Sequence, residues 1–298
     1  MFTGLSAFPL TPLRHDIVDE SAYAGLVARL AEAGVDSIGA LGSTGSYAYL
    51  DRDERRQAVR VAVENAGVVP VIVGIGATRT SHVQAFAEDA QHAGAAAVLL
   101  APLSYQPLTE DEVFGLYEDV TAGLSVPLVV YDNPSTTRFT FSDDLYASVA
   151  KLPHVASIKI PGVPDAPDAA RARVDELRGR LPDGVTIGVS GDALGAIGMN
   201  AGSDAWYSVI GGVLPMEALA ITRAARAGDA AAAIAASDRL QPIWDLFDGH
   251  GGSLRVAAAI AEHLGLVAHS SLPRPIRGLG EAQRTDVGRV VDGLLSQR

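Results

Sequence analysis

Eight short apolar runs follow one another along the chain, and they constrain its fold more than any other feature. Most runs are rich in Val, Ile, Leu or Ala and contain few polar residues, which is typical of strands buried on both faces of a parallel sheet. Such strands need helices to cover them. The runs comprise residues 4–8, 37–41, 71–75, 97–101, 128–131, 156–160, 186–189 and 205–209.

Segments with helical periodicity separate these runs. The apolar residues of the segment 21–34 fall on one helical face, and Gly34 at its end is a typical C-terminal stop. Thr109 and Glu112 have the spacing of a capping box, and Ser142 is a favourable N-cap residue. The pattern therefore predicts a helix after nearly every strand.

Alternating strands and helices leave two candidate architectures. Eight strand-and-helix units favour a closed (β/α)₈ TIM barrel over an open sheet. An open nucleotide-binding sheet would have G-x-G-x-x-G after the first strand, whereas residues 8–12 read Phe-Pro-Leu-Thr-Pro. We therefore expect an α/β protein with a (β/α)₈ barrel.

The strand pattern ends after residues 211–212, and only helical segments follow. Residues 215–228, 229–248, 253–265 and 284–297 are rich in alanine and leucine and contain no further apolar run of strand type. The predicted domains are a catalytic barrel over residues 1–224 and a small C-terminal helical region over 225–298.

Charge and hydropathy exclude several kinds of partner. The 298 residues carry a net charge of −12, which argues against nucleic acid and against an anionic membrane surface. The longest apolar runs are too short to cross a bilayer, and residues 1–6 lack the basic region and following apolar stretch of a signal peptide. The absence of cysteine excludes disulfides but does not fix the compartment, and the cytoplasm is the default expectation.

Lys159 is the most informative residue for chemistry. The chain contains only two lysines, Lys151 and Lys159, and the second lies inside the apolar run 156–160. A buried lysine can lose its proton and become a nucleophile, whereas an arginine cannot. A lysine placed in a buried strand by a chain that otherwise uses arginine therefore indicates an amine with a chemical role.

Polar residues follow the other strands at the positions that face the mouth of a barrel. They do not form the acidic or histidine pairs that magnesium or zinc sites need, and the seven histidines are scattered, so we expect no metal. These strand ends comprise residues 42–46, 102–105, 131–134, 190–192 and 206–208.

A strand-borne lysine without a metal suggests covalent catalysis on a carbonyl compound. The amine of Lys159 would form a Schiff base with a keto group, and the protonated nitrogen would act as the electron sink. Tyr131, at the end of the neighbouring strand, would donate and accept the protons. Backbone amides and the hydroxyls of Ser43 and Thr44, in a turn that opens at Gly42, would hold a carboxylate.

Together these motifs resemble the dihydrodipicolinate synthase and N-acetylneuraminate lyase family along nearly the whole chain. The matching motifs are Gly-Ser-Thr-Gly at 42–45, Tyr-Asp-Asn-Pro at 131–134 and Ser-Ile-Lys-Ile at 157–160. The resemblance implies a class I lyase or aldolase that binds pyruvate or another 2-keto acid on Lys159 without a cofactor. It also implies a homotetramer built as a dimer of dimers.

Departures from the family pattern concern the second substrate. The turn ends in Ser46 where the family has glutamate, and Asp132 stands where asparagine is usual. Thr136 occupies the position of an arginine that grips the aldehyde's carboxylate in the synthases, and Arg138 is the nearest arginine. Tyr105 lies one residue beyond the place of a tyrosine that the synthases exchange between subunits.

Gly191 and Trp206 complete the predicted substrate pocket, because each lies at the end of a late strand. Trp206 and its neighbour Tyr207 would suit a larger or more apolar second substrate.

Several substrates stay open at this point. Aspartate semialdehyde, a 2-keto-3-deoxy sugar acid or N-acetylneuraminate, and the substrates of a dehydratase or an aromatic aldehyde aldolase all fit the motifs. A non-catalytic ligand-sensing paralogue is the alternative of another class, since fold alone does not fix function. Neither the direction of the reaction nor an effector is predicted.

Overall fold

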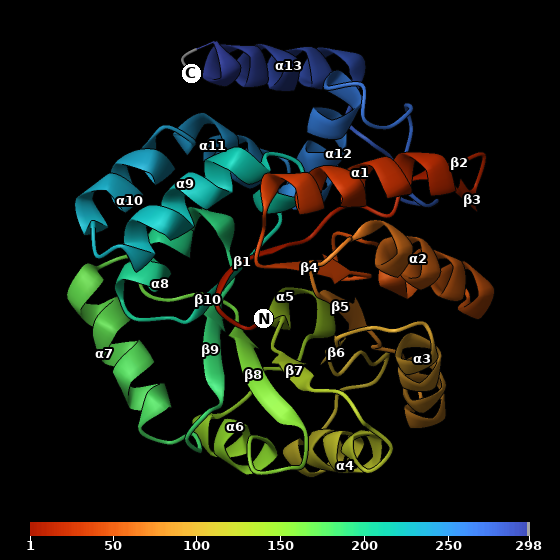
Figure 1. Cartoon of the computed structure of the whole chain (residues 1–298), viewed down its shortest axis with the longest axis vertical. Helices are drawn as coiled ribbons and strands as arrows, with labels where there is room; N and C mark the ends of the chain where they lie inside the picture. The colour runs from red at the N-terminus through yellow and green to blue at the C-terminus, as the bar shows by residue number, and fades with distance from the viewer. Residues whose placement is uncertain (297–298) are drawn as a thin grey trace.

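A closed barrel of eight parallel strands forms the centre of the computed structural model, which describes residues 1–296 (Figure 1). Strand β1 pairs with both β10 and β4, which closes the sheet and confirms the predicted (β/α)₈ fold. The barrel strands are β1 (Gly4–Ala7), β4 (Ser37–Ala40), β5 (Val71–Gly74), β6 (Ala97–Leu100), β7 (Leu128–Tyr131), β8 (Val155–Ile160), β9 (Thr186–Val189) and β10 (Ala205–Ser208).

A small antiparallel hairpin, which the sequence pattern did not predict, lies between β1 and the first helix. Its strands β2 (Leu13–Arg14) and β3 (Ile17–Val18) are joined by His15 and Asp16, both with left-handed φ angles of 53° and 65°. Two-residue strands are too short to show periodicity in a sequence.

Helices surround the barrel as an outer ring (Figure 1). The predicted ends are confirmed: Thr109 and Glu112 form a capping box, the Ser142 side chain accepts from the Leu145 amide, and Gly34 is left-handed at φ 72°. The ring comprises α1 (Glu20–Ala33), α2 (Arg52–Asn65), α3 (Thr80–His92), α4 (Glu110–Thr121), α6 (Asp143–Val149), α7 (Pro167–Arg178), α8 (Gly195–Asn200) and α9 (Pro215–Arg226), with the one-turn α5 (Pro134–Thr137) after β7.

Two apolar cores result from the alternation of side chains along each strand. The larger one lies between the barrel and its helices and includes Trp206. The smaller one fills the barrel interior and includes Phe8, Tyr131 and Tyr207. Successive residues of one strand thus belong to different cores, and Trp206 and Tyr207 point in opposite directions.

The C-terminal region is helical, as predicted, but one boundary was wrong. The segment 229–248, expected as one helix, forms α10 (Ala230–Asp238) and α11 (Gln241–Gly249). Pro242 lies in the first turn of α11; it lacks an N–H and its ring would clash with the Asp238 carbonyl of a continuous helix. Helices α12 (Ser253–His263) and α13 (Glu281–Leu295) follow.

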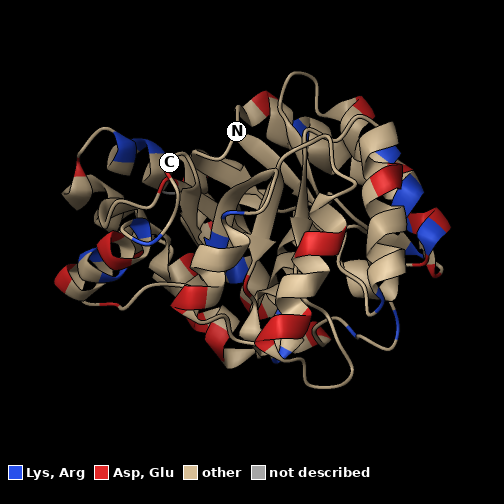
Figure 2. Cartoon of the chain, turned by 90° about the horizontal axis from the view of Figure 1, so that it is seen from below, with Lys and Arg blue, Asp and Glu red and all other residues tan. Residues whose placement is uncertain are grey.

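The predicted domain boundary at 224/225 falls within the last turn of α9 and stays a prediction. In Figure 1, α13 packs beside α12 outside the helical ring. Charged residues lie mainly on the helices and loops, and the strands carry few (Figure 2). Within residues 1–296, no helix is both long and apolar enough to cross a membrane.

Candidate active site

Lys159 faces a cavity of about 720 Å³ at the C-terminal ends of the barrel strands. It lies near the end of β8 and is only 4% exposed. Its Nζ atom lies 4.2 Å from the centre of the Phe8 ring, 4.1 Å from that of Tyr131 and 5.7 Å from that of Tyr207. Three aromatic rings therefore hold the amine at the cavity wall, away from bulk water.

The Phe8 ring approaches Lys159 because the next strand lacks side chains in its way. A Cβ atom on Gly42 would lie 2.5 Å from the Phe8 ring, and one on Gly39 would also collide with it. Gly42 is therefore required for close packing, whereas Leu41 and Ser46 take the left-handed conformation in this turn, with φ of 55° and 54°.

Tyr131 belongs to a hydrogen-bonded group beside the lysine. Its hydroxyl lies 3.3 Å from Ser43 Oγ, and the Asn133 amide Nδ2 donates to both oxygens, at 2.9 Å to Tyr131 and 3.1 Å to Ser43. Ser135 donates to Asn133 Oδ1 at 2.8 Å, which fixes the orientation of the amide. Since Asn133 donates to the Tyr131 oxygen, the tyrosine keeps its own proton for another acceptor.

The turn that carries Ser43 and Thr44 is anchored from below by a buried arginine. Arg55 of α2 donates to the Tyr47 carbonyl at 2.6 and 3.0 Å and to the Gly76 carbonyl at 3.0 Å. Burial lowers the pKa of Arg55 to about 10 and raises the pKa of the Tyr47 phenol. Thr44 and Tyr47 both line the cavity, so Arg55 fixes the wall opposite Lys159.

Asp192 is a buried carboxylate on the same cavity. It accepts from the Ile210 amide at 2.6 Å and from the Val209 amide at 3.1 Å, which ties the loop after β9 to the loop after β10. Burial raises the pKa of Asp192 to about 6, although both amides and the charge of Lys159 lower it. Asp192 therefore positions the loop after β10 against the loop after β9.

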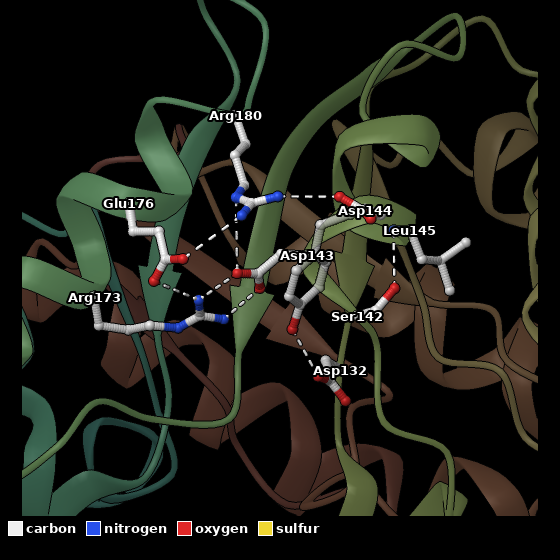
Figure 3. Close-up of polar contacts among 9 residues, drawn as sticks. Asp132, Ser142, Asp143, Asp144, Leu145, Arg173, Glu176 and Arg180 are labelled. Atoms are coloured by element: carbon white, nitrogen blue, oxygen red, sulfur yellow. Dashed lines mark hydrogen bonds and ion pairs between the residues drawn. The ribbon is translucent and has the colours of Figure 1, made fainter.

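Behind Tyr131, a second carboxylate faces away from the cavity. Asp132 Oδ2 accepts from the Tyr146 hydroxyl at 2.6 Å, and burial raises the pKa of Asp132. Beside this pair, Arg173 binds both oxygens of Asp143 at 2.6 and 2.7 Å, which links α7 to α6 (Figure 3). The end of β7 is therefore held by α6, and α6 by α7.

Six of the ten predicted site residues line the cavity and four do not. Trp206 is fully buried on the outer face of β10, and Tyr207 takes its place inside, because adjacent strand residues point to opposite faces. Tyr105 is 91% exposed, Arg138 is an exposed left-handed residue after α5, and Gly42 lies behind Ser43. The six residues in the cavity wall are Ser43, Thr44, Tyr131, Thr136, Lys159 and Gly191.

Four residues of the site were not predicted from the sequence. Phe8 and Tyr47 are aromatic, directly after a strand and directly after the turn, and that position was their only signal. Asn133 and Asp192 lie within strand-end motifs that were noted, but a partner far along the chain gives each its role. Within residues 1–296, no group of three or more His, Asp or Glu side chains is arranged to hold a metal ion.

A (β/α)₈ barrel with a buried lysine at its C-terminal mouth, flanked by a tyrosine and a hydroxyl-bearing turn, has the architecture of class I aldolases. A family model described as Dihydrodipicolinate synthetase family matches residues 1–293. The chain therefore belongs to the dihydrodipicolinate synthetase family, and it is a lyase of the Schiff-base type that this family comprises.

Curated relatives and solved structures agree with this assignment. The 4-hydroxy-tetrahydrodipicolinate synthase of Phenylobacterium zucineum is 31% identical over 290 residues, which is 96% of this chain and 95% of the relative. That of Halorhodospira halophila is 31% identical over 99% of this chain and 98% of its own. The crystal structure of dihydrodipicolinate synthase from Agrobacterium tumefaciens superposes with a TM-score of 0.94 at 45% identity, covering 98% of both chains.

A more distant structure shares the fold. The dihydrodipicolinate synthase of Acinetobacter baumannii, solved in complex with pyruvate, has a TM-score of 0.88 at 24% identity and covers 99% of both chains.

Proposed function

We propose that Lys159 forms a covalent imine with pyruvate or a closely related 2-keto acid. The observation that carries this proposal is the position of its Nζ atom, buried in the cavity wall 4.1 Å from the centre of the Tyr131 ring. The amine adds to the keto carbon and water leaves, which gives a protonated imine. That imine is the electron sink, so the proposed reaction needs no metal and no separate cofactor.

Ser43 and Thr44 are proposed to hold the keto acid's carboxylate. Both line the cavity on the turn after β4, across the barrel mouth from Lys159. Thr44 is only 5% exposed and lines the cavity, so its hydroxyl is proposed to donate to the ligand. Loss of a methyl proton from the imine then gives an enamine, which is the carbon nucleophile of aldol addition.

Tyr131 is proposed to move the protons of these steps. Its hydroxyl receives a hydrogen bond from Asn133 and lies beside Ser43, so its own proton points to the reacting atoms or to Ser43. In the cleavage direction the same tyrosine accepts the proton of the alcohol that becomes the aldehyde.

The assembly and compartment are also proposals. A homotetramer built as a dimer of dimers would bury Tyr105, whose 91% exposure leaves it available to a neighbouring subunit. The cytoplasm stays the predicted compartment. Either synthesis or cleavage fits the residues of the site, with a 2-keto-3-deoxy sugar acid, an N-acetylneuraminate-type acid or a dehydratase substrate as alternatives to aspartate semialdehyde.

Borohydride trapping tests the proposal. The protein is incubated with pyruvate and sodium borohydride, and the reduced three-carbon adduct is located by peptide mass spectrometry. Since Lys151 is the only other lysine, it serves as an internal control for nonspecific labelling. We expect the adduct on Lys159 and none in Lys159→Met. A folded protein that remains unlabelled, or carries the label on Lys151 alone, excludes the mechanism and leaves a ligand-sensing role.

A further inference from the structure

The charged residues that line the cavity around Lys159 restrict which second substrate it can bind. Of the described residues that line it, the only cation is Lys159, whereas Asp192 and Asp248 are acidic. In the proposed reaction the lysine nitrogen is joined to the keto acid. No cationic side chain then remains to pair with a carboxylate or phosphate on the aldehyde.

The two residues that the sequence offered for this role do not supply a charge. Arg138 is exposed, ends α5 in a left-handed conformation and does not line the cavity. Thr136 does line the cavity, but its hydroxyl donates to the Asn133 carbonyl at 3.3 Å.

Two more hydroxyls of the wall are engaged, whereas among the described residues the buried Ser46 Oγ has no partner. Ser135 donates to Asn133 Oδ1 at 2.8 Å, and Ser190 donates to the Ile160 carbonyl at 2.6 Å. These groups therefore present mainly oxygen lone pairs to the cavity, and an anion needs donors. A carboxylate placed beside these residues would lose water without gaining a charged partner, which is costly.

One feature of the wall favours a negative charge. The N-terminus of α12 reaches the cavity through Ser253 and Leu254. A helix terminus attracts an anion only weakly when solvent is near, and Asp248 carries a negative charge at the same mouth.

The remaining wall is apolar. Trp244 and Phe247 of α11, both less than 10% exposed, face the cavity together with Leu254 and Ile276 from the C-terminal region. Leu103 and Tyr49 contribute from loops of the barrel. The indole N–H of Trp244 donates to the Ser237 carbonyl, so its ring offers an apolar contact.

We infer that the second substrate is an uncharged aldehyde with an apolar or aromatic body, an inference that rests on the proposed Schiff-base function. The enamine carbon of the Lys159-bound keto acid attacks the aldehyde carbon and forms the new carbon–carbon bond. The aldehyde oxygen takes the proton of the Tyr131 hydroxyl. Water then releases a 4-hydroxy-2-keto acid and the free amine, so no oxidant or reductant is needed.

The test measures pyruvate-dependent product formation with three aldehydes: benzaldehyde, D-glyceraldehyde and succinate semialdehyde. We expect kcat/KM for benzaldehyde to exceed that for succinate semialdehyde by about 100-fold or more, because the anion leaves its charge unpaired in the cavity. A preference for succinate semialdehyde overturns the inference, and so does a preference for glyceraldehyde or failure of benzaldehyde to react.

A variant adds the missing charge. Thr136→Arg should raise kcat/KM for succinate semialdehyde at least about tenfold, whereas Thr136→Gln, of similar length but uncharged, should not. No gain in Thr136→Arg would also overturn the inference. Trapping of pyruvate alone on Lys159 separates the two proposals: a labelled enzyme that prefers the anion refutes the substrate class only, and an unlabelled one refutes the shared mechanism.

Discussion

Tyr131 and Lys159 lie opposite each other on the neighbouring strands β7 and β8, and the lysine nitrogen stands 4.1 Å from the centre of the tyrosine ring. Register partners in a parallel sheet project to the same side, so both side chains enter the barrel mouth together. Tyr207 flanks the amine from the other side, at 5.7 Å, with its hydroxyl bound to Ser157 at 2.8 Å. Both tyrosine rings therefore contact the Lys159 amine, but only the Tyr131 hydroxyl lies in the proposed proton path, since that of Tyr207 is bonded to Ser157.

Tyr131→Phe should therefore lower kcat much more than Tyr207→Phe. The first change removes the proposed proton carrier and leaves the ring, and general acid–base groups contribute about 10²- to 10⁴-fold. The second removes a hydroxyl that is hydrogen-bonded to Ser157 inside the barrel, and kcat should fall less than about tenfold. Steady-state rates with pyruvate and the best aldehyde check this. Equal losses of kcat in the two variants would show that the Tyr131 hydroxyl is not the proton carrier.

Asn133 should determine whether the Tyr131 hydroxyl acts as a hydrogen-bond donor or acceptor towards the substrate. Its amide donates to both Tyr131 and Ser43, so Asn133→Ala removes the orientation and should lower kcat about tenfold. Asn133→Asp presents an acceptor at the same place, which should draw the tyrosine proton away from the substrate and cost more. The two variants are compared by kcat and by the KM for pyruvate. If Asn133→Asp is more active than Asn133→Ala, the proposed direction of the hydrogen bond from Asn133 to Tyr131 is wrong.

Much of the fold was predictable because each barrel strand is a short, mostly apolar run. The observed strands begin within one residue of the predicted starts. The α10–α11 break was not recognised because apolar residues continue on both sides of Pro242. The β2–β3 hairpin depends on two left-handed residues, His15 and Asp16, which are not glycines and gave no signal.

A site residue was predictable from the sequence only where its type is chemically reactive and its sequence context is unusual. Lys159 qualifies, because lysine is scarce in this chain and the residue lies in an apolar run. Trp206 and Tyr207 could not be told apart, since both suit a strand and only the barrel's register determines which one faces inward. The role of Asn133 depends on contacts 88 to 90 positions away in the turn at Ser43, as the Tyr131 and Asn133 bonds to that residue demonstrate.

The hydrogen bond between Tyr146 and Asp132 should stabilise the fold measurably. Tyr146→Phe leaves the buried carboxylate without this donor, at a cost of about 1.5–3 kcal/mol in the free energy of unfolding. Asp132→Asn keeps an acceptor and removes the charge, so it should cost less. In Tyr146→Phe/Asp132→Asn no unpaired charge stays buried, and part of the loss should return. Urea unfolding at pH 7.5 measures all three, and strictly additive losses would contradict the pairing.

Asp192 should make stability depend on pH between about 4 and 6. Its pKa is raised from 3.8 to about 6 by burial, so the folded state binds this proton more tightly than the unfolded chain does. The stabilisation is complete below the unfolded pKa and is lost as pH rises through the folded one, by up to about 3 kcal/mol. Unfolding of the wild type and of Asp192→Asn is compared from pH 4.5 to 7.5. Parallel curves would show that Asp192 is ionised throughout.

Gly42→Ala should lower the reactivity of the Lys159 amine indirectly, by displacing the Phe8 ring that packs against it. The new Cβ atom would lie 2.5 Å from the Phe8 ring, which is below any contact that a Cβ normally makes. Phe8 must then move from its place over the Lys159 nitrogen, and overpacking of this kind costs about 1–3 kcal/mol. We expect the rate of pyruvate trapping on Lys159 to fall at least about tenfold, because small displacements of a reacting group are expensive.

Gly25→Ala is the matched control, since a Cβ atom there meets nothing within 4 Å in the middle of α1. That variant should gain about 0.5–1 kcal/mol of stability and trap pyruvate at the wild-type rate. If Gly42→Ala also traps at the wild-type rate, the aromatic wall formed by Phe8 does not position the amine, and the close approach at Gly42 serves packing alone.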